Sequence, residues 1–292
     1  MLEDGFWHGE IMDQHIHLDR RNLYMDAVNE FVKAGGTAIN LVHKPDFKNL
    51  PKKINDYEKA YRDTVDMSNE IRNNFDIDVL VTLGPHPVSW EKQIMKMGYE
   101  KSTDLHLEAV NLALEFISDG DAACLGEVGR PHYPVNNKTW NKANELLLQI
   151  IEMAAKERVS IQLHVESDGE KTYSDISKLC KEAKMPKKKA IRHFAPSNLD
   201  SGFTNGISAT VSVGKGSVEK IIETMEDSVS IWGMETDFLD DSQRPGAVLG
   251  PKTVPKRTQQ LCSRMWELEY SDNEIIDLMK NIHSNWPKEI YQ

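Results

Sequence analysis

Short apolar stretches with many β-branched residues alternate along the chain with longer stretches in which apolar positions recur at helical spacing. The short stretches predict buried strands, and the longer ones predict amphipathic helices. A repeated order of strand and helix is typical of a parallel sheet covered by helices. The predicted strands are residues 9–17, 37–43, 77–84, 122–129, 160–165, 190–194, 207–213 and 229–236, and the predicted helices are residues 25–34, 54–73, 105–118, 140–158, 173–183, 217–225 and 256–268.

Eight such strands in a chain of 292 residues favour a closed (β/α)8 barrel of the TIM type, which is typically about 250 residues long. We therefore predict an α/β protein with a single barrel domain over residues 1–292. The alternative is an open, doubly wound sheet. That alternative is disfavoured because the first strand ends in His15-Ile16-His17-Leu18-Asp19 and not in a glycine-rich phosphate-binding turn.

Two segments lie outside the repeats. Residues 239–255 contain three prolines and two glycines, and they predict an active-site loop over the mouth of the barrel. Residues 273–291 predict a C-terminal helix.

The composition indicates a globular protein with a packed core. Apolar residues make up 39% of the chain and the formal net charge is −11, which disfavours broad wrapping of nucleic acid. No apolar stretch approaches the roughly 18 residues of a membrane helix, and the N-terminus lacks the cationic start of a secretion signal. We therefore expect a cytoplasmic protein with no membrane partner. Three widely spaced cysteines indicate neither a disulfide framework nor a paired-cysteine zinc site.

Candidate metal ligands stand at the ends of several predicted strands. His15 and His17 are two residues apart on the first strand, so both side chains face the barrel lumen, where two neutral imidazoles can chelate a divalent metal. Glu127 ends an apolar stretch, and a buried carboxylate there is costly unless something compensates its charge. His164, His193 and Asp237 end three further strands.

Each of these residues alone has an ordinary structural explanation, such as a hydrogen-bonded core histidine or an aspartate that caps a helix. Together they predict one cluster, because the strand ends of a closed barrel converge. Four imidazoles and two carboxylates suffice for two divalent metals if Glu127 bridges them. Such a centre activates water, so it predicts hydrolysis. Four imidazoles suit Zn²⁺, and Mg²⁺ or Mn²⁺ is the alternative.

The same residues belong to motifs that resemble the TatD-type metal-dependent hydrolases of the amidohydrolase superfamily. This resemblance implies a TIM barrel in which His15, His17 and Asp237 hold one metal and His164 and His193 hold the second. It also implies that Glu127 bridges the metals and that Asp237 orients or deprotonates the attacking water, which makes these two the candidate catalytic residues. The motifs are Asp13-Gln14-His15-Ile16-His17-Leu18-Asp19, Leu83-Gly84-Pro85-His86-Pro87, Gly126-Glu127-Val128-Gly129, His164, His193-Phe194, Glu235-Thr236-Asp237 and Pro287-Lys288-Glu289-Ile290-Tyr291.

Residues beside these motifs differ from the nuclease members of the family. The nucleases continue their glutamate motif as Gly-Leu-Asp-Tyr-Tyr, whereas Gly129 here precedes Arg130-Pro131-His132-Tyr133. Glu166 stands where the nucleases usually have arginine, and Phe194-Ala195-Pro196-Ser197 replaces Cys-Phe-Ser-Gly. The chain looks more like an uncharacterised archaeal-type branch. The predicted metal ligands are thus retained while the surrounding substrate-binding residues differ.

Four residues near the predicted ligands are candidates for substrate binding. Arginine matches the oxygens of a phosphate or carboxylate bidentately, and histidine can donate to a substrate oxygen. Each of the four could equally have a structural role, as an ion-paired or solvated residue or as a histidine packed at the rim. The candidates are His86, Arg130, His132 and Arg192.

The sequence therefore predicts a metal-dependent hydrolase with two divalent ions. Phosphoesters, including the ends of DNA strands, are the first expected substrates, because the predicted centre is cationic and the nuclease relatives cleave them. The alternative is an amidohydrolase or lactonase that acts on a small cyclic amide or ester. A second alternative is a metal-binding scaffold without activity. The sequence does not specify the oligomeric state.

Overall fold

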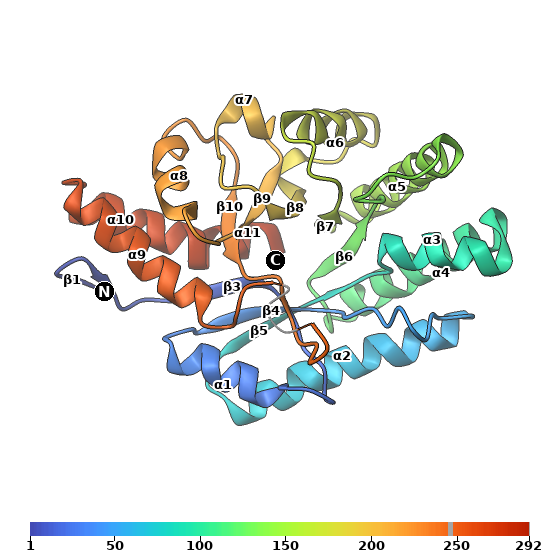
Figure 1. The fold of residues 1–292 in the computed structure, drawn as a ribbon, viewed down its shortest axis with the longest axis horizontal. Coiled ribbons are helices and arrows are strands. Elements are labelled where there is room, and N and C mark those ends of the chain that lie inside the picture. Colours follow the sequence, from blue (N-terminus) through green and yellow to red (C-terminus); the bar gives the residue numbers. More distant parts are fainter. Residues whose placement is uncertain (245–247, 292) are drawn as a thin grey trace.

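The central sheet curls into a barrel whose parallel strands follow one another in chain order (Figure 1). The computed structural model describes residues 1–244 and 248–291. The hydrogen-bonded order is β10-β9-β8-β7-β6-β5-β4-β3-β11, and all eight predicted strands are confirmed. The strands of the sheet are β3 (Met12–His17), β4 (Ala38–Val42), β5 (Asp78–Leu83), β6 (Cys124–Gly129), β7 (Ile161–His164), β8 (Ala190–Ala195), β9 (Ser208–Ser212), β10 (Trp232–Glu235) and β11 (Phe238–Leu239).

The barrel closes through a short strand, β11, that the sequence pattern did not predict. After β10 the chain turns at Thr236 and continues as β11, which pairs with β3 at Ile16 and His17. The carboxylate of Asp13 in β3 accepts hydrogen bonds from the backbone N–H and the hydroxyl of Thr236, at 3.1 and 2.7 Å. This segment therefore joins the two ends of the sheet, and the prediction of a barrel fold is confirmed.

Helices cover the outer face of the barrel (Figure 1). The seven predicted helices are present, with their ends moved by up to six residues. The pattern missed α3, because Pro85 and Pro87 indicate a turn; instead Pro87 occupies the first helical position, where its missing N–H costs nothing. The helices are α1 (Met25–Lys33), α2 (Ile54–Asn74), α3 (Pro87–Met97), α4 (Tyr99–Ser118), α5 (Asn137–Glu157), α6 (Glu170–Glu182), α7 (Ser201–Thr204), α8 (Ser217–Thr224), α9 (Thr253–Glu267), α10 (Asp272–Lys280) and α11 (Trp286–Tyr291), with a 3₁₀ turn at Lys187–Lys189.

The apolar core lies between the sheet and these helices. Strand residues that point outward, such as Leu125 and Leu163, pack with Leu147 and Ile150 of α5 in one buried cluster. A second cluster joins β9 and β10 to α9 and α10 around Trp232. Polar side chains on alternate strand positions are left to face the lumen.

Both ends of the chain pack against the barrel. The N-terminal end forms a hairpin of β1 (Leu2–Glu3) and β2 (Phe6–Trp7), which the sequence pattern did not predict. The backbone N–H and carbonyl of Trp7 form hydrogen bonds with the side chain of Gln259 in α9, and these bonds hold the hairpin in place. The predicted helix over 273–291 consists of α10, a π-helical turn at Asn281–Asn285 and α11. At its end, buried Tyr291 brings its hydroxyl to 3.4 Å from Oε1 of Gln14.

The predicted loop over 239–255 begins one residue later than expected, because Leu239 belongs to β11. The loop ends where α9 begins, at Thr253. Residues 245–247 of this loop lie outside the described residues. Asp240 fastens the start of the loop, since its carboxylate accepts backbone hydrogen bonds from Asp19, Leu23 and Tyr24 at 2.9 to 3.0 Å. Across residues 1–244 and 248–291, no helix combines the length and apolar character needed to cross a membrane.

Candidate metal centre

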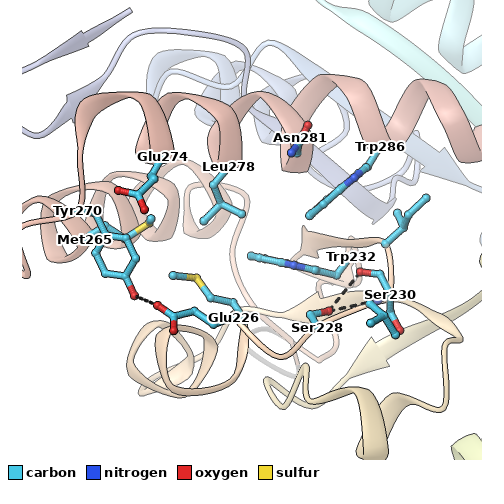
Figure 2. Close-up of a pocket in the computed structure, with 13 residues that line it drawn as sticks. Glu226, Ser228, Ser230, Trp232, Met265, Tyr270, Glu274, Leu278, Asn281 and Trp286 are labelled. Atoms are coloured by element: carbon cyan, nitrogen blue, oxygen red, sulfur yellow. Dashed lines mark hydrogen bonds between the residues drawn. The ribbon is translucent and has the colours of Figure 1, made fainter.

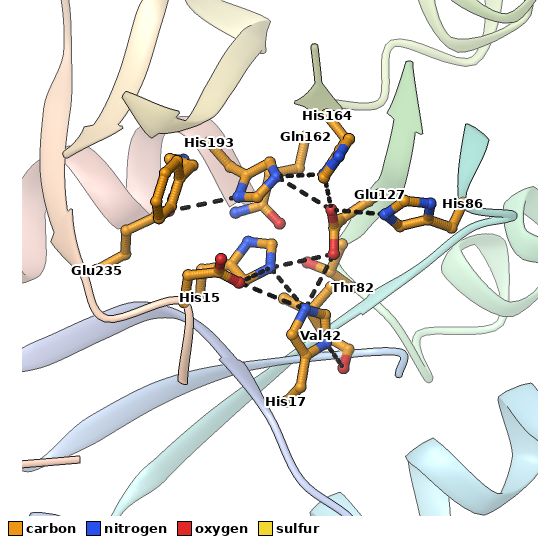
Figure 3. A network of polar contacts seen from close by, with 12 residues as sticks. His15, His17, Val42, Thr82, His86, Glu127, Gln162, His164, His193 and Glu235 are labelled. Atoms are coloured by element: carbon orange, nitrogen blue, oxygen red, sulfur yellow. Dashed lines mark hydrogen bonds and ion pairs between the residues drawn. The ribbon is translucent and has the colours of Figure 1, made fainter. Parts of the chain in front are cut away.

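The six predicted ligand residues meet at the carboxyl ends of the barrel strands. They come from β3, β6, β7, β8 and the turn after β10, and the imidazoles surround one carboxylate in Figure 3. This region contains three groups of residues whose possible ligand atoms lie within 4.8 Å of one another inside each group. These groups are His15 with His17 and Asp237, His15 with His193 and Glu235, and His86 with Glu127 and His164.

Glu127 stands at the middle of the cluster. Its Oε1 lies 2.9 Å from Nε2 of His17 and 3.3 Å from Nε2 of His15. Its Oε2 lies 2.6 Å from Nδ1 of His164 and 3.0 Å from Nε2 of His193. Burial raises the pKa of Glu127, but the surrounding histidines outweigh it and hold that pKa well below the usual value. Each oxygen of this ionised carboxylate therefore faces a different pair of imidazoles.

Glycines on either side of Glu127 let β6 lie close to β7. A Cβ at Gly129 would stand 1.9 Å from the carbonyl oxygen of His164, and a Cβ at Gly126 would stand 2.8 Å from Cβ of Gln162. Neither position has room for a side chain. The Gly-Glu-Val-Gly motif thus holds Glu127 and His164 at their short separation.

The orientation of His17 is fixed by a backbone carbonyl. Its Nδ1 lies 3.0 Å from the carbonyl oxygen of Val42, which can only accept, so Nδ1 carries the proton and donates. In the neutral ring the lone pair on Nε2 then faces Glu127. Burial lowers the pKa of His17, but its hydrogen bond and charge interaction with Glu127 outweigh this effect and raise the pKa overall. Nε2 of His17 can therefore contact this carboxylate favourably only when a proton or another cation lies between them.

Asp237 completes the group around His15 and His17. Its Oδ1 lies 3.7 Å from Nε2 of both histidines. The backbone at Asp237 has a φ of 50°, a left-handed conformation that aspartate tolerates better than most residues, and it turns the chain from β10 into β11. Burial raises the pKa of Asp237 to about 7, and the nearby carboxylates of Glu127 and Glu235 act in the same direction.

The donor set fits a divalent cation. Nε2 of His15 lies 3.1 Å from Nε2 of His17, and both nitrogens face the same space as oxygens of Glu127 and Asp237. Lone pairs and carboxylate oxygens that converge in a buried space repel one another unless a cation lies between them. Nitrogen and carboxylate ligands are those of catalytic zinc sites.

His86, predicted as a substrate-binding residue, lies beside this cluster. It precedes α3, and its Nδ1 accepts the backbone N–H of Val88 at 3.1 Å. The neutral ring therefore carries its proton on Nε2, which lies 3.5 Å from Oε2 of Glu127. His86 is thus placed to donate a hydrogen bond toward the centre and is poorly placed to ligate a metal through that nitrogen.

His132, another predicted substrate-binding residue, also reaches the cluster. It lies in the loop after β6, and its Nδ1 stands 2.7 Å from Nε2 of His164. Its side chain is exposed at the mouth of the barrel. It therefore contacts the outer edge of a predicted ligand.

The two predicted arginines do not face the centre. Nε of buried Arg130 donates to Oε2 of Glu166 at 2.8 Å, its Nη2 pairs with the other oxygen, and the guanidinium lies over the ring of Trp140. Buried Arg192 lies over the ring of Tyr173 and donates to the backbone oxygen of Glu166. Both guanidinium groups are thus engaged with residues other than the predicted metal ligands, and the interpretation of both arginines as anion-binding residues stays a prediction.

Glu235 is a buried residue of the site that the sequence reasoning did not single out. Its Oε1 accepts the backbone N–H of Phe194 at 2.6 Å and lies 3.5 Å from Nδ1 of His193. Glu235 could have been identified from its spacing, because a residue two positions before Asp237 on a strand points toward the same lumen. Glu235 thus places its carboxylate beside Nδ1 of His193, while Nε2 of the same ring faces Glu127.

A cleft of about 690 Å³ opens at the other end of β10, where the strand begins at Trp232 (Figure 2). Trp286, Met265 and Leu278 form much of its wall, and the hydroxyl of Tyr270 donates to Glu226 across it. None of the predicted site residues lines this cleft. The predicted site residues therefore lie away from this cleft, at the opposite end of the barrel.

The comparison with known families agrees with this geometry. The sequence model of a family described as TatD related DNase matches residues 12–284. The chain belongs to this family. An uncharacterized protein of Methanocaldococcus jannaschii is 30% identical over 259 residues, which are 87% of this chain and 88% of that relative. The resemblance to TatD-type hydrolases and to an archaeal branch is thus confirmed.

Solved structures show the same fold at low sequence identity. The TatD homologue YjjV of Escherichia coli has a TM-score of 0.61 and 17% identity, with 98% of this chain and 99% of that chain covered. The phosphotriesterase homology protein of Escherichia coli, complexed with phosphate in its active site, has a TM-score of 0.59 and 11% identity, with 98% and 100% covered. Family and fold together show that this TatD-family protein is a metal-dependent hydrolase.

Proposed function

We propose that the protein hydrolyses phosphoester bonds, either at the end of a nucleic-acid strand or in a small molecule. The observation that carries this proposal is the position of Glu127, which directs one oxygen to each of two imidazole pairs. A carboxylate in that position can bridge two cations. A centre of two cations suits phosphoryl transfer because it stabilises both the attacking and the leaving oxygen.

Glu127 stands between the two sets of residues that would hold the two divalent ions. His15, His17 and Asp237 would hold one ion, and His164 and His193 would hold the other, with Glu127 shared between them. We propose Zn²⁺ because four of the ligands are imidazoles, with Mg²⁺ or Mn²⁺ as the alternative. When bound, such ions lower the pKa of a water molecule toward about 7 and neutralise charge on phosphoryl oxygens.

The side chains of the site have separate tasks in this reaction. Asp237 accepts the proton of the attacking water, since its Oδ1 lies 3.7 Å from Nε2 of both His15 and His17 and so faces the centre. The Nε2 proton of His86 donates to a substrate oxygen at the mouth of the centre. Glu127 remains ionised and holds the two halves of the centre together.

Two comparisons support a phosphoester substrate. The matching family is described as TatD related DNase, and the phosphotriesterase homology protein carries phosphate in its active site on the same fold. A phosphoester is also the substrate whose charge complements a centre of two divalent ions.

A second candidate is the hydrolysis of a small cyclic amide or ester. The observation that favours it is the burial of Arg130 and Arg192 against other protein groups, so neither guanidinium is exposed to a substrate phosphate. A neutral substrate needs no such cation. This candidate uses the same ligands and the same proton acceptor.

The test compares wild type with Asp237→Asn on two substrate classes. Metal content is measured first, and hydrolysis is then followed on an end-labelled DNA strand, bis(p-nitrophenyl) phosphate and a small lactone. We expect turnover of the phosphoesters and a fall in kcat of about 10²- to 10⁴-fold in Asp237→Asn, because the proton acceptor is lost. Asp66→Asn, at an exposed position in α2, is the control and should keep wild-type activity.

Three results would contradict the proposal in different ways. Turnover of the lactone alone would favour the second candidate. Full activity of Asp237→Asn would remove Asp237 from the mechanism. A wild type that holds two metals and hydrolyses neither substrate class would show a metal-binding scaffold.

A further inference from the structure

We propose that His132 is a positioning residue, which holds the imidazole of His164 with Nδ1 directed at the metal centre. This inference rests on the metal centre of the proposed function. It replaces the expectation that His132 serves to bind substrate.

The hydrogen bonds of His164 carry the inference. Its Nδ1 lies 2.6 Å from Oε2 of Glu127 and 2.9 Å from Nε2 of His193, so this nitrogen faces the centre. Its Nε2 lies 2.7 Å from Nδ1 of His132. The two rings meet edge to face, with centroids 4.7 Å apart.

The chemistry of imidazole determines what His132 must do. A neutral imidazole carries one N–H, so His164 offers a lone pair on Nδ1 only when its proton is on Nε2. That N–H then needs an acceptor, and Nδ1 of His132 is at hydrogen-bond distance. Metal-binding histidines commonly donate their second N–H to such an acceptor, which fixes both tautomer and ring orientation.

The loop that carries His132 is fastened on both sides. Before it, Arg130 is paired with Glu166. After it, the hydroxyl of Tyr133 donates to Glu91 of α3, and the side chain of Asn136 accepts the backbone N–H of Thr139 at the start of α5. The ring of Tyr133 also meets the ring of His132 edge to face. His132 is therefore held against His164 by the fold of the loop itself.

The ring of His132 has two nitrogens, and one of them contacts His164. Because Nδ1 of His132 is engaged with His164, only its Nε2 remains for a substrate. A positioning role predicts a change in metal affinity when His132 is replaced, whereas a role in substrate binding predicts a change in KM.

The experiment measures metal binding by wild type, His132→Ala and His132→Asn. Zn²⁺ is titrated in competition with a chromophoric chelator, and Co²⁺ is used to record the absorption spectrum of the centre. We expect His132→Ala to bind the more weakly held ion about 10- to 100-fold less tightly. His132→Asn should recover most of the affinity, because its side-chain oxygen replaces Nδ1 as the acceptor. His8→Ala is the control, since exposed His8 lies by the N-terminal hairpin with Glu3 as its partner.

Circular dichroism and the unfolding midpoint of the metal-free protein should be unchanged in both His132 variants, because the side chain is exposed. Wild-type metal affinity in His132→Ala would overturn the inference, and so would an asparagine variant as weak as the alanine variant. An unchanged metal affinity with a raised KM for bis(p-nitrophenyl) phosphate would assign His132 to substrate binding. If wild type binds Zn²⁺ but hydrolyses no phosphoester, the proposed function fails while the metal titration still decides this inference. A wild type that binds neither ion overturns both.

Discussion

At the scale of single residues, several of the histidines around Glu127 have a partner outside the centre. The carbonyl of Val42 fixes His17, and the carboxylate of Glu235 stands behind His193. Such partners determine which ring nitrogen is free and how well it is aimed. The arrangement of the centre therefore depends on residues that touch no substrate.

Replacing Glu235 with glutamine should weaken the centre without unfolding the protein. The amide keeps the size of the side chain and can still accept the N–H of Phe194, but it removes the negative charge 3.5 Å from Nδ1 of His193. We expect an affinity for Zn²⁺ about 10- to 100-fold lower, measured by chelator competition. Glu108→Gln, at an exposed position in α4, should bind as wild type does. Equal affinity in Glu235→Gln would show that this carboxylate only caps the backbone of Phe194.

Individual site residues could be predicted from the sequence to different degrees. The candidate metal ligands could be identified because a histidine or a carboxylate ends strand after strand. The direction of the Arg192 side chain away from the lumen could also have been predicted, since Arg192 is adjacent to His193 on β8 and neighbours on a strand face opposite sides. The partner of Arg130 could not, because Glu166 lies 36 positions away and meets it only in the folded barrel.

At the scale of elements, the alternation of strand and helix was readable because the two periods differ, at 2.0 and about 3.6 residues. The strand that closes the barrel, β11, could not be predicted in this way, because it follows a turn at Thr236 whose stability depends on Asp13 in β3. A pattern within one segment carries no information about a partner more than two hundred residues away. The close contact between β6 and β7 likewise cannot be predicted from the pattern within either strand.

Gly129→Ala should force β6 and β7 apart. The added Cβ would stand 1.9 Å from the carbonyl oxygen of His164, so the backbone has to move. Overpacking of this kind costs about 1 to 3 kcal/mol or more of unfolding free energy. Urea unfolding measures the loss, and metal affinity should fall with it because His164 is displaced. Gly250→Ala is the matched control, since a Cβ there meets nothing within 4 Å. Equal unfolding midpoints for the two variants would refute the argument from close contact.

At the scale of the whole molecule, stability should depend on pH through histidines that are buried and uncharged. His106 in α4 is 1% exposed, and its Nδ1 has no hydrogen-bond partner among the described residues. Burial lowers the pKa of His106 to about 3. The unfolded chain takes up a proton at this residue near pH 6.5, whereas the folded protein does so only near pH 3. Stability from this residue is therefore complete above pH 6.5 and is lost as the pH falls toward 3.

His106→Leu should remove this part of the acid sensitivity. Between pH 7 and pH 5, the uptake of a proton by His106 in the unfolded state alone lowers the unfolding free energy of wild type by about 2 kcal/mol. Leucine has a similar volume and cannot ionise, so the variant should lose that much less over the same interval. Urea unfolding at both pH values, with a chelator present to keep metal away, measures the difference. The other buried histidines titrate equally in both proteins, so their contribution cancels in the comparison. His8→Leu, at an exposed position, should follow wild type. If wild type and His106→Leu lose the same free energy on acidification, His106 is not held uncharged by the core.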